Sequence, residues 1–174
     1  MLRGELVALR PIRRADLALL AEWRNDADVR VRTREHAGLT ELDQERWFEA
    51  VVCAPTRTRA NHMFAVEVAG ELVGCVGLCY WSARDQTAEI SFYVGPDARG
   101  KGYGTEALKL LIGWGFGELN LERIFAEAYQ FNEPGIKLLE RLGFKREGTL
   151  RSHAYRMGQR HDATMLGLLR SEWR

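Results

Sequence analysis

The sequence contains few of the residues that mark linkers, disulfide frameworks or membrane spans. Proline accounts for 4 of 174 residues and cysteine for 3, and no Cys-x-x-Cys pair occurs. An odd number of cysteines within apolar stretches indicates reduced, buried thiols in a cytoplasmic protein. No apolar run approaches the roughly 20 residues that cross a bilayer, and no secretory leader is recognisable after Met1. These absences predict a protein with neither a disulfide scaffold nor a membrane partner.

An excess of charge of either sign is also missing. Lys plus Arg number 25 and Asp plus Glu number 24, so the net charge is +1 and gives no electrostatic reason to bind nucleic acid. The 46% of apolar residues can bury a core, and the length suits a single domain over residues 1–174. The histidines show no metal-ligand spacing, so no metal is predicted. They are His36, His62, His153 and His161.

Hydrophobic periodicity predicts the order strand, two helices, three strands, helix, strand, helix, two strands. Helices are expected from Asp16, after a Thr40-x-x-Asp43 capping box, after Gly104 and from Asn132. An early antiparallel run followed by strand–helix units indicates an α/β (α+β) fold with a mixed sheet. The expected strands cover 5–10, 61–69, 72–81 (after a Gly70-Glu71 turn), 87–94, 123–129, 145–149 and 163–169.

The most informative stretch joins strand 87–94 to the helix that follows it. Residues 95–104 read GPDARGKGYG. Such glycines let backbone N–H groups converge, and a helix N-terminus adds partial positive charge, so the loop suits a phosphate or pyrophosphate. Arg99 and Lys101 add two basic side chains to it.

Three phosphate-binding patterns fit this loop. The first, Gly95-x-x-x-x-Gly100-Lys101, follows a nucleotide P-loop, but Gly102 stands where a hydroxyl ligand for Mg²⁺ is needed. The second, Gly102-x-Gly104-x-x-Ala107, loosely follows a dinucleotide fingerprint, which belongs to a parallel unit rather than to a loop after a hairpin. The third is Arg99-x-x-Gly102-x-Gly104 after a strand.

The third pattern resembles the acetyl-CoA signature of the GNAT (Gcn5-related) N-acetyltransferases. Residues 132–144, NEPGIKLLERLGF, are similar to the second acetyl-CoA segment of that family. Leu9-Arg10-Pro11, EWRN at 22–25 and the closing residues 161–173 resemble the branch that includes the ribosomal-protein N-terminal acetyltransferases. The resemblance implies a mixed, mostly antiparallel sheet with helices on both faces and a splayed strand pair. It also implies acetyl transfer from acetyl-CoA to a primary amine of a protein N-terminus or a small molecule.

The resemblance further implies where the cofactor lies. Its pantetheine arm is expected to pair with the end of strand 87–94, whose N–H groups would polarise the thioester carbonyl. The loop is expected to hold the phosphates, and Asn132 either contacts the arm or caps the helix that follows. The expected cofactor-binding residues are Phe92, Tyr93, Val94, Arg99, Gly100, Lys101, Gly102, Tyr103, Gly104, Thr105, Asn132 and Lys137.

Acetyl transfer needs a neutral amine, and an alkyl amine of pKa about 10 is almost wholly protonated at neutral pH. Glu89 is the candidate general base, on the polar side of strand 87–94, and the alternative is an exposed strand carboxylate. Many members of the family place a tyrosine acid where Leu139 stands here. Tyr129 or Tyr155 could replace it, but packing roles suit both, and solvent or the attacking amine is the simpler proton donor.

Arginine and histidine gather in two segments that the resemblance places beside the acceptor. A cationic rim would favour an anionic acceptor and disfavour polyamines and aminoglycosides, whereas the alternative is a solvated surface. The rim residues are Arg30, Arg32, Arg34, Arg151, His153, Arg156, Arg160 and His161. A monomer or a homodimer is expected. The rival functions are an acetyl-CoA-binding module with little transfer activity and a P-loop-type nucleotide enzyme.

Overall fold

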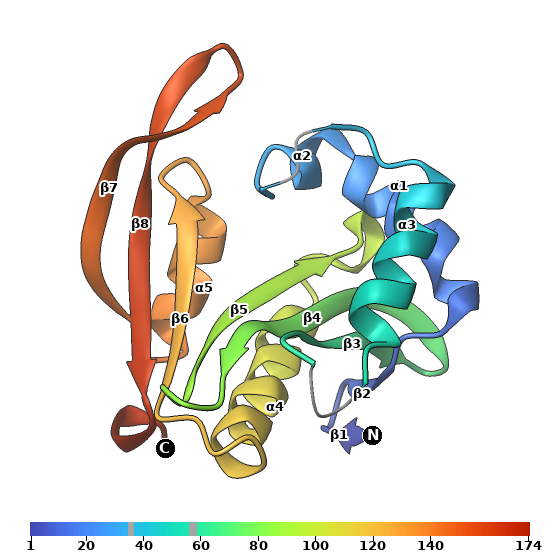
Figure 1. The fold of residues 1–174 in the computed structure, drawn as a ribbon, viewed down its shortest axis with the longest axis horizontal. Coiled ribbons are helices and arrows are strands. Elements are labelled where there is room, and N and C mark those ends of the chain that lie inside the picture. The colour runs from blue at the N-terminus through green and yellow to red at the C-terminus, as the bar shows by residue number, and fades with distance from the viewer. Residues whose placement is uncertain (35–36, 56–58) are drawn as a thin grey trace.

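A computed structural model describes residues 1–34, 37–55 and 59–174, which form an eight-stranded sheet with helices on both faces (Figure 1). The strands lie in the order β1-β2-β3-β4-β5-β6-β8-β7. They are β1 (Leu2–Arg3), β2 (Ala8–Pro11), β3 (His62–Val68), β4 (Glu71–Ser82), β5 (Thr87–Val94), β6 (Arg123–Tyr129), β7 (Lys145–Arg156) and β8 (Gln159–Leu169). The α-helices are α1 (Leu17–Asn25), α2 (Ala27–Arg30), α3 (Glu41–Trp47), α4 (Tyr103–Gly117) and α5 (Glu133–Arg141).

The sheet is mixed and mostly antiparallel, as predicted. Its parallel pair is β5 with β6, and the two strands pair only over Thr87–Glu89 and Arg123–Phe125. Beyond these residues the strands separate, and Figure 1 shows their ribbons diverging toward the top of the view. The expected splayed strand pair is therefore present, and it begins directly after Glu89.

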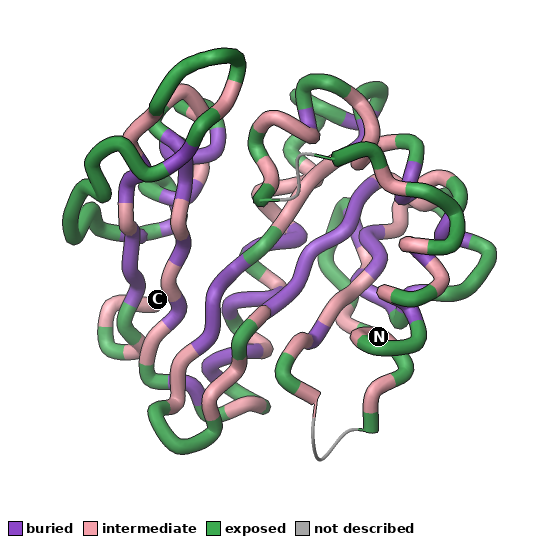
Figure 2. Tube along the Cα trace, turned by 45° about the horizontal axis from the view of Figure 1, so that its top comes forward, coloured by how far each residue is buried: buried purple, intermediate pink, exposed green. Residues whose placement is uncertain are grey.

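Strand alternation explains why helices cover both faces. On β3 and β4, Val66 and Val76 belong to the core under α4 and α5. Their sequence neighbours Ala65 and Cys75 pack on the opposite face with residues of α1. Figure 2 shows the buried segments concentrated in the central strands between these layers. The stripe predicted for α4 is confirmed, since Leu108, Leu111, Ile112 and Gly115 are all buried.

The predicted first strand begins too early. The N–H groups of Glu5 and Leu6 donate to the carboxylate of Glu106 in the first turn of α4, so these residues do not join the ladder. Strand β2 starts at Ala8 and includes Pro11, which was expected to stop it. The Thr40 capping box of α3 is confirmed, with the Asp43 N–H 3.2 Å from the Thr40 hydroxyl.

Two turns also differ from the prediction. The β3–β4 turn is made by Ala69 and Gly70, with φ of 50° and 89°, and Glu71 already pairs in β4. The last hairpin is much longer than 145–149 and 163–169, because β7 and β8 continue to a turn at Met157 and Gly158. Most side chains near its tip are exposed, so this part carries no apolar alternation to detect. In the described part of the chain, no helix has the length and apolarity needed to cross a membrane.

Candidate active site

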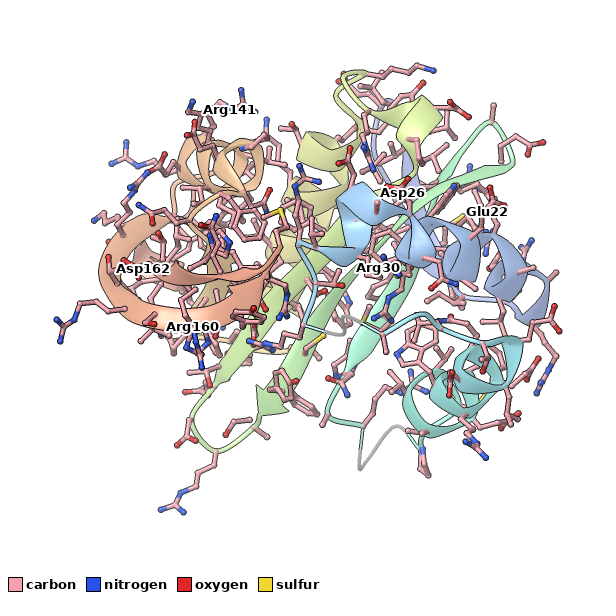
Figure 3. The ribbon with its side chains drawn as sticks, turned by 90° about the horizontal axis from the view of Figure 1, so that it is seen from above. Glu22, Asp26, Arg30, Arg141, Arg160 and Asp162 are labelled. Carbon is pink, nitrogen blue, oxygen red and sulfur yellow. The ribbon has the colours of Figure 1, made fainter. Side chains whose placement is uncertain are left out.

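A cleft of about 1000 Å³ opens where β5 and β6 separate. Its walls come from β5, the loop before α4, β6, α5 and the segment after α1. Figure 3 views the molecule from above, with Asp26 and Arg30 on the side of α2, Arg141 on α5 and Arg160 on the β7–β8 hairpin. Residues distant in sequence thus converge on one cavity large enough for a cofactor-sized ligand.

The backbone of β5 offers unpaired hydrogen-bonding groups to this cleft. The Gly95 N–H donates to the Val73 carbonyl over 2.9 Å, so odd-numbered residues of this strand face β4. The Gln86 carbonyl accepts two N–H groups at the edge of β6, so even-numbered residues face β6. Because pairing with β6 ends at Glu89, the N–H and C=O groups of Phe92 and Val94 face the cleft, where the Val94 carbonyl accepts a hydrogen bond from Nε of Arg99 over 3.4 Å. An extended ligand can pair with them as an added strand.

The N-terminus of α4 supplies a second set of donors. Gly102 is its N-cap at φ 83°, a left-handed conformation that suits glycine. The first helical bond here runs from the Glu106 N–H to the Gly102 carbonyl over 3.2 Å, so the N–H groups before it have no partner within the helix. Such a terminus binds phosphate through its donors and its dipole. The cleft-lining residues of this stretch are Arg99, Gly100, Gly102, Tyr103, Gly104 and Thr105.

The basic side chains expected on the phosphates are engaged elsewhere or lie outside the cleft. Arg99 lies 3.5 Å from Asp28 and 3.7 Å from Asp26, so a phosphate would have to draw it away from these carboxylates. Lys137 pairs with Glu133 at 3.2 Å on the exposed side of α5, and neither Lys137 nor Lys101 lines the cleft. Their contacts with the cofactor stay predictions.

Asn132 lines the cleft, and its side chain does not cap α5. The amide lies over Gly135, where a Cβ would be 2.6 Å from the Asn132 Nδ2 atom. Glycine at 135 therefore leaves room for this amide beside the cleft. Leu139 lines the same wall, so no hydroxyl stands where the resemblance implies a tyrosine.

Glu89 is a buried carboxylate at the point where the strands part. It is 8% exposed, which excludes the exposed alternative. Its two oxygens lie 2.7 and 3.0 Å from Nη2 of Arg34. Burial raises the pKa of Glu89 above its ordinary value, the Arg34 charge opposes that shift, and the nearby Glu127 carboxylate adds to it. Glu89 is therefore a more basic carboxylate than an exposed one.

The two tyrosines considered as general acids in place of Leu139 lie in different positions. Tyr129 lines the cleft, and its hydroxyl accepts a hydrogen bond from Nη2 of Arg156 over 3.0 Å. Burial raises the Tyr129 pKa. Tyr155 is 60% exposed on the hairpin and does not line the cleft, so the structure does not bring it to the site.

The arginines expected to form a cationic rim are largely matched by carboxylates or lie outside the cleft. Arg34 lies between Glu89 and Glu127, and Arg32 is 3.6 Å from Asp28. The Arg156 guanidinium donates to the carbonyls of residues 33 and 34. The rim residues that do not line the cleft are Arg30, Arg151, His153, Arg156, Arg160 and His161. The structure thus gives little support to selection of an anionic acceptor.

Sequence analysis missed Glu127, the second carboxylate beside Arg34 in the cleft, whose side chain is largely buried. Its side chain is 13% exposed and lies 3.1 Å from the His153 ring. A charge between the buried Ala126 and Ala128 on a short strand was the available signal. His36 lies outside the described residues. Among residues 1–34, 37–55 and 59–174, no three His, Cys, Asp or Glu side chains gather as metal ligands do.

Comparisons with known proteins agree with this geometry. The model of the acetyltransferase (GNAT) domain family matches residues 7–145. The uncharacterized N-acetyltransferase p20 of Bacillus licheniformis is 31% identical, over 97% of this chain and 96% of its own. Spermidine N(1)-acetyltransferase of Escherichia coli (strain K12) is 28% identical, over 96% of this chain and 88% of its own length. The structure of spermidine N-acetyltransferase from Vibrio cholerae with CoA and spermine has a TM-score of 0.89 at 23% identity. That match covers 97% of this chain and 98% of the Vibrio cholerae chain.

The chain belongs to the GNAT acetyltransferase family. It is an N-acyltransferase, and acetyl-CoA is the co-substrate of this family. The resemblance seen in the glycine-rich loop is confirmed, while the ribosomal branch stays a prediction. The family match replaces the P-loop and dinucleotide alternatives. Gly102 stands where a P-loop needs Ser or Thr, and β5 follows an antiparallel hairpin in a mixed sheet.

Proposed function

We propose that the protein transfers the acetyl group of acetyl-CoA to a primary amine of a small molecule, with Glu89 as general base. One observation carries this proposal: β5 leaves β6 directly after Glu89. A buried carboxylate therefore lies between an unpaired backbone edge and an open cleft. When bound, acetyl-CoA supplies an activated acetyl thioester for the amine to attack.

The residues along β5 and α4 suit the parts of this co-substrate. The N–H and C=O groups of Phe92 and the N–H group of Val94 would pair with the extended arm, and the donors at the start of α4 would take the phosphates. The Asn132 amide would contact the arm from the opposite wall. A backbone N–H of β5 aimed at the thioester oxygen would stabilise the negative charge that develops there.

Glu89 would take the proton of the acceptor amine. Its raised pKa moves its basicity toward the working pH, which favours proton transfer. The departing thiolate has a pKa of about 8.5, so it leaves with little help from a general acid. This agrees with Leu139, which cannot donate a proton, at the position where many family members have a tyrosine.

Two observations favour a small molecule over a protein N-terminus. The 28% identical relative from Escherichia coli is named for a small amine, spermidine. Arg156 of β7 also spans to the carbonyls of Thr33 and Arg34 at 3.2 and 3.0 Å. This bridge joins the hairpin to the segment that carries Arg34, and a compact amine needs less space beside it than a peptide chain does.

The test starts with thermal unfolding in acetyl-CoA, ATP with Mg²⁺, or NAD. A ligand at about 100 times its Kd adds about 2.7 kcal/mol of stability, and only acetyl-CoA is expected to do so. Release of the CoA thiol is then followed with a panel of small amines and short peptides. Glu89→Gln should lower kcat about a hundredfold or more with cofactor affinity unchanged.

Glu118→Gln, at the exposed end of α4, is the matched control and should behave as wild type. An unchanged kcat in Glu89→Gln at every pH would remove Glu89 from the mechanism. Stabilisation by ATP alone, or turnover with peptides alone, would contradict the proposed co-substrate or acceptor.

A further inference from the structure

Among the described residues, one nitrogen atom of Arg34 contacts both Glu89 and Glu127. Nη2 lies 2.7 and 3.0 Å from the two Glu89 oxygens and 3.4 Å from Oε2 of Glu127. Arginine usually meets a carboxylate with two nitrogens in parallel. Here one NH₂ group sits between two carboxylates, which is the arrangement that a primary ammonium would adopt.

The two carboxylates are buried, but the arginine between them is not. The Glu89 and Glu127 side chains are 11% and 13% exposed, whereas Arg34 is 45% exposed. All three line the cleft. The cation can therefore leave toward solvent, but the carboxylates cannot follow it. Without a cation, two buried negative charges would face each other, and that is costly.

The segment that carries Arg34 contacts Tyr80 and Arg156. Its guanidinium lies 5.5 Å from the ring of Tyr80, which is itself 60% exposed. Its carbonyl and that of Thr33 accept from Arg156, whose Nε is buried without a hydrogen-bond partner in the described chain. A buried donor without a partner costs free energy, so this closed arrangement is incompletely satisfied.

We infer that Nη2 of Arg34 occupies the position of the acceptor nitrogen, so that the chain's own guanidinium must be displaced by the substrate. This inference rests on the proposed function and deepens it. The acceptor is then a cationic aliphatic amine whose ammonium replaces Nη2 between Glu89 and Glu127. Glu89 takes the proton from that ammonium and Glu127 remains its counter-charge. An acceptor with a carboxylate close to its amine would place like charges together and is disfavoured.

Such an internal competitor lowers the apparent affinity for the acceptor, because only the fraction of molecules with Arg34 displaced can bind it. The other charged and titratable groups nearby are His153, which contacts Glu127, and Arg156, which contacts Tyr129. Neither places a nitrogen within reach of Glu89. Removal of Arg34 therefore takes away the nitrogen between the two carboxylates, while Arg32, which also lines the cleft, keeps its contact with Asp28.

The experiment compares Arg34→Gln with Arg34→Lys, which keeps a displaceable cation, and with Arg30→Gln. Arg30 ends α2 and does not line the cleft, so its variant removes one charge from the same segment. Two acceptors of equal length are used, 1,4-diaminobutane and 4-aminobutanoate, at alkaline pH where Glu89 is ionised. Diamine binding without cofactor is measured by calorimetry, and unfolding confirms that each variant is folded.

Arg34→Gln should lower both the KM and the Kd for the diamine about tenfold, with Arg34→Lys and Arg30→Gln near wild type. A raised or unchanged diamine KM in Arg34→Gln overturns the inference. So does a KM that rises selectively for 4-aminobutanoate, since Arg34 would then hold an acceptor carboxylate. Tighter diamine binding without acetyl transfer by any variant would instead contradict the proposed function and leave the inference standing.

Discussion

Two arginines of this protein each lie between two carboxylates, yet they have different roles. Arg10 on β2 meets Asp16 with two nitrogens, at 2.7 and 2.9 Å, and turns its Nε to Glu67. Its side chain is 4% exposed. Arg34 uses one nitrogen for both of its carboxylates and is 45% exposed. Arg10 therefore uses all three of its guanidinium nitrogens for carboxylates, whereas in the described chain Arg34 uses one of its three.

The carboxylates of the two groups respond in opposite ways. Burial alone would raise the pKa of Asp16, but the Arg10 hydrogen bonds and the Arg13 N–H hold it below its ordinary value. Burial raises the pKa of Glu89 above its ordinary value despite Arg34. The Arg10 guanidinium holds Asp16 with two nitrogens and stabilises its charged form. Arg34 holds Glu89 with one nitrogen beside a cleft, and Glu89 stays a more basic carboxylate. The comparison separates a structural ion pair from an exchangeable one.

The largest effect that tests this contrast is on stability. Arg10→Leu should lower the free energy of unfolding by about 3–5 kcal/mol, because it leaves Asp16 charged and buried without its partner. Arg34→Gln should lower it by less than Arg10→Leu does, because Arg34 is 45% exposed and the carboxylates that it leaves line an open cleft where water reaches them. Urea unfolding at neutral pH measures both values. Equal losses in the two variants would make Arg34 a structural residue.

The half of the cleft that we propose binds the cofactor could be predicted from sequence because its signals are local. A glycine-rich loop, a helix start and the alternation of Thr87–Val94 lie in one continuous stretch. Each positions backbone groups, and backbone geometry follows from short-range residue preferences. The fold class followed from the order of predicted elements along the whole chain, and the splayed strands followed from the resemblance.

The acceptor half could be predicted only in part because no local spacing records it. Arg34, Glu89, Glu127 and Arg156 come from four separate segments that meet only after the sheet has formed. Glu89 was found through the strand that carries it. Helix α2 is four residues long, and the hairpin tip is exposed, so neither leaves a periodic pattern. Counting arginines indicated a cationic rim, but the carboxylates that neutralise them come from other strands.

A second prediction distinguishes the role of Gly102 in the loop before α4 from the general cost of placing alanine at a positive φ angle. Gly102 and Gly70 have φ of 83° and 89°, and a Cβ at either position would meet no atom closer than 3.7 Å. Alanine at either site should cost about 1–2 kcal/mol of stability. Gly102→Ala should also weaken acetyl-CoA binding about tenfold, because the N–H groups that follow it lose their direction. Calorimetric titration of acetyl-CoA checks this, and equal affinities in the two variants would place the phosphates elsewhere.

The smallest effect concerns the pH dependence of the reaction. Glu89 acts as a base only when ionised, so kcat/KM should rise with pH through the pKa of Glu89 in the free enzyme. The Glu127 charge raises that pKa and the Arg34 charge lowers it. The acid limb is the part of the profile in which kcat/KM rises with pH. Glu127→Gln should therefore move this limb to lower pH, and Arg34→Gln should move it to higher pH. Profiles of kcat/KM against pH at low salt measure both shifts.

His153→Gln is the control for this measurement, because its ring lies 3.1 Å from Glu127 and is the other titratable group beside that carboxylate. If the limb moves with His153→Gln and not with Glu127→Gln, the titrating group is the histidine. Opposite movements in the Glu127 and Arg34 variants would show that both charges act on one carboxylate. That outcome distinguishes Glu89 from Asp16, whose saturated ion pair leaves it no proton to exchange at the working pH.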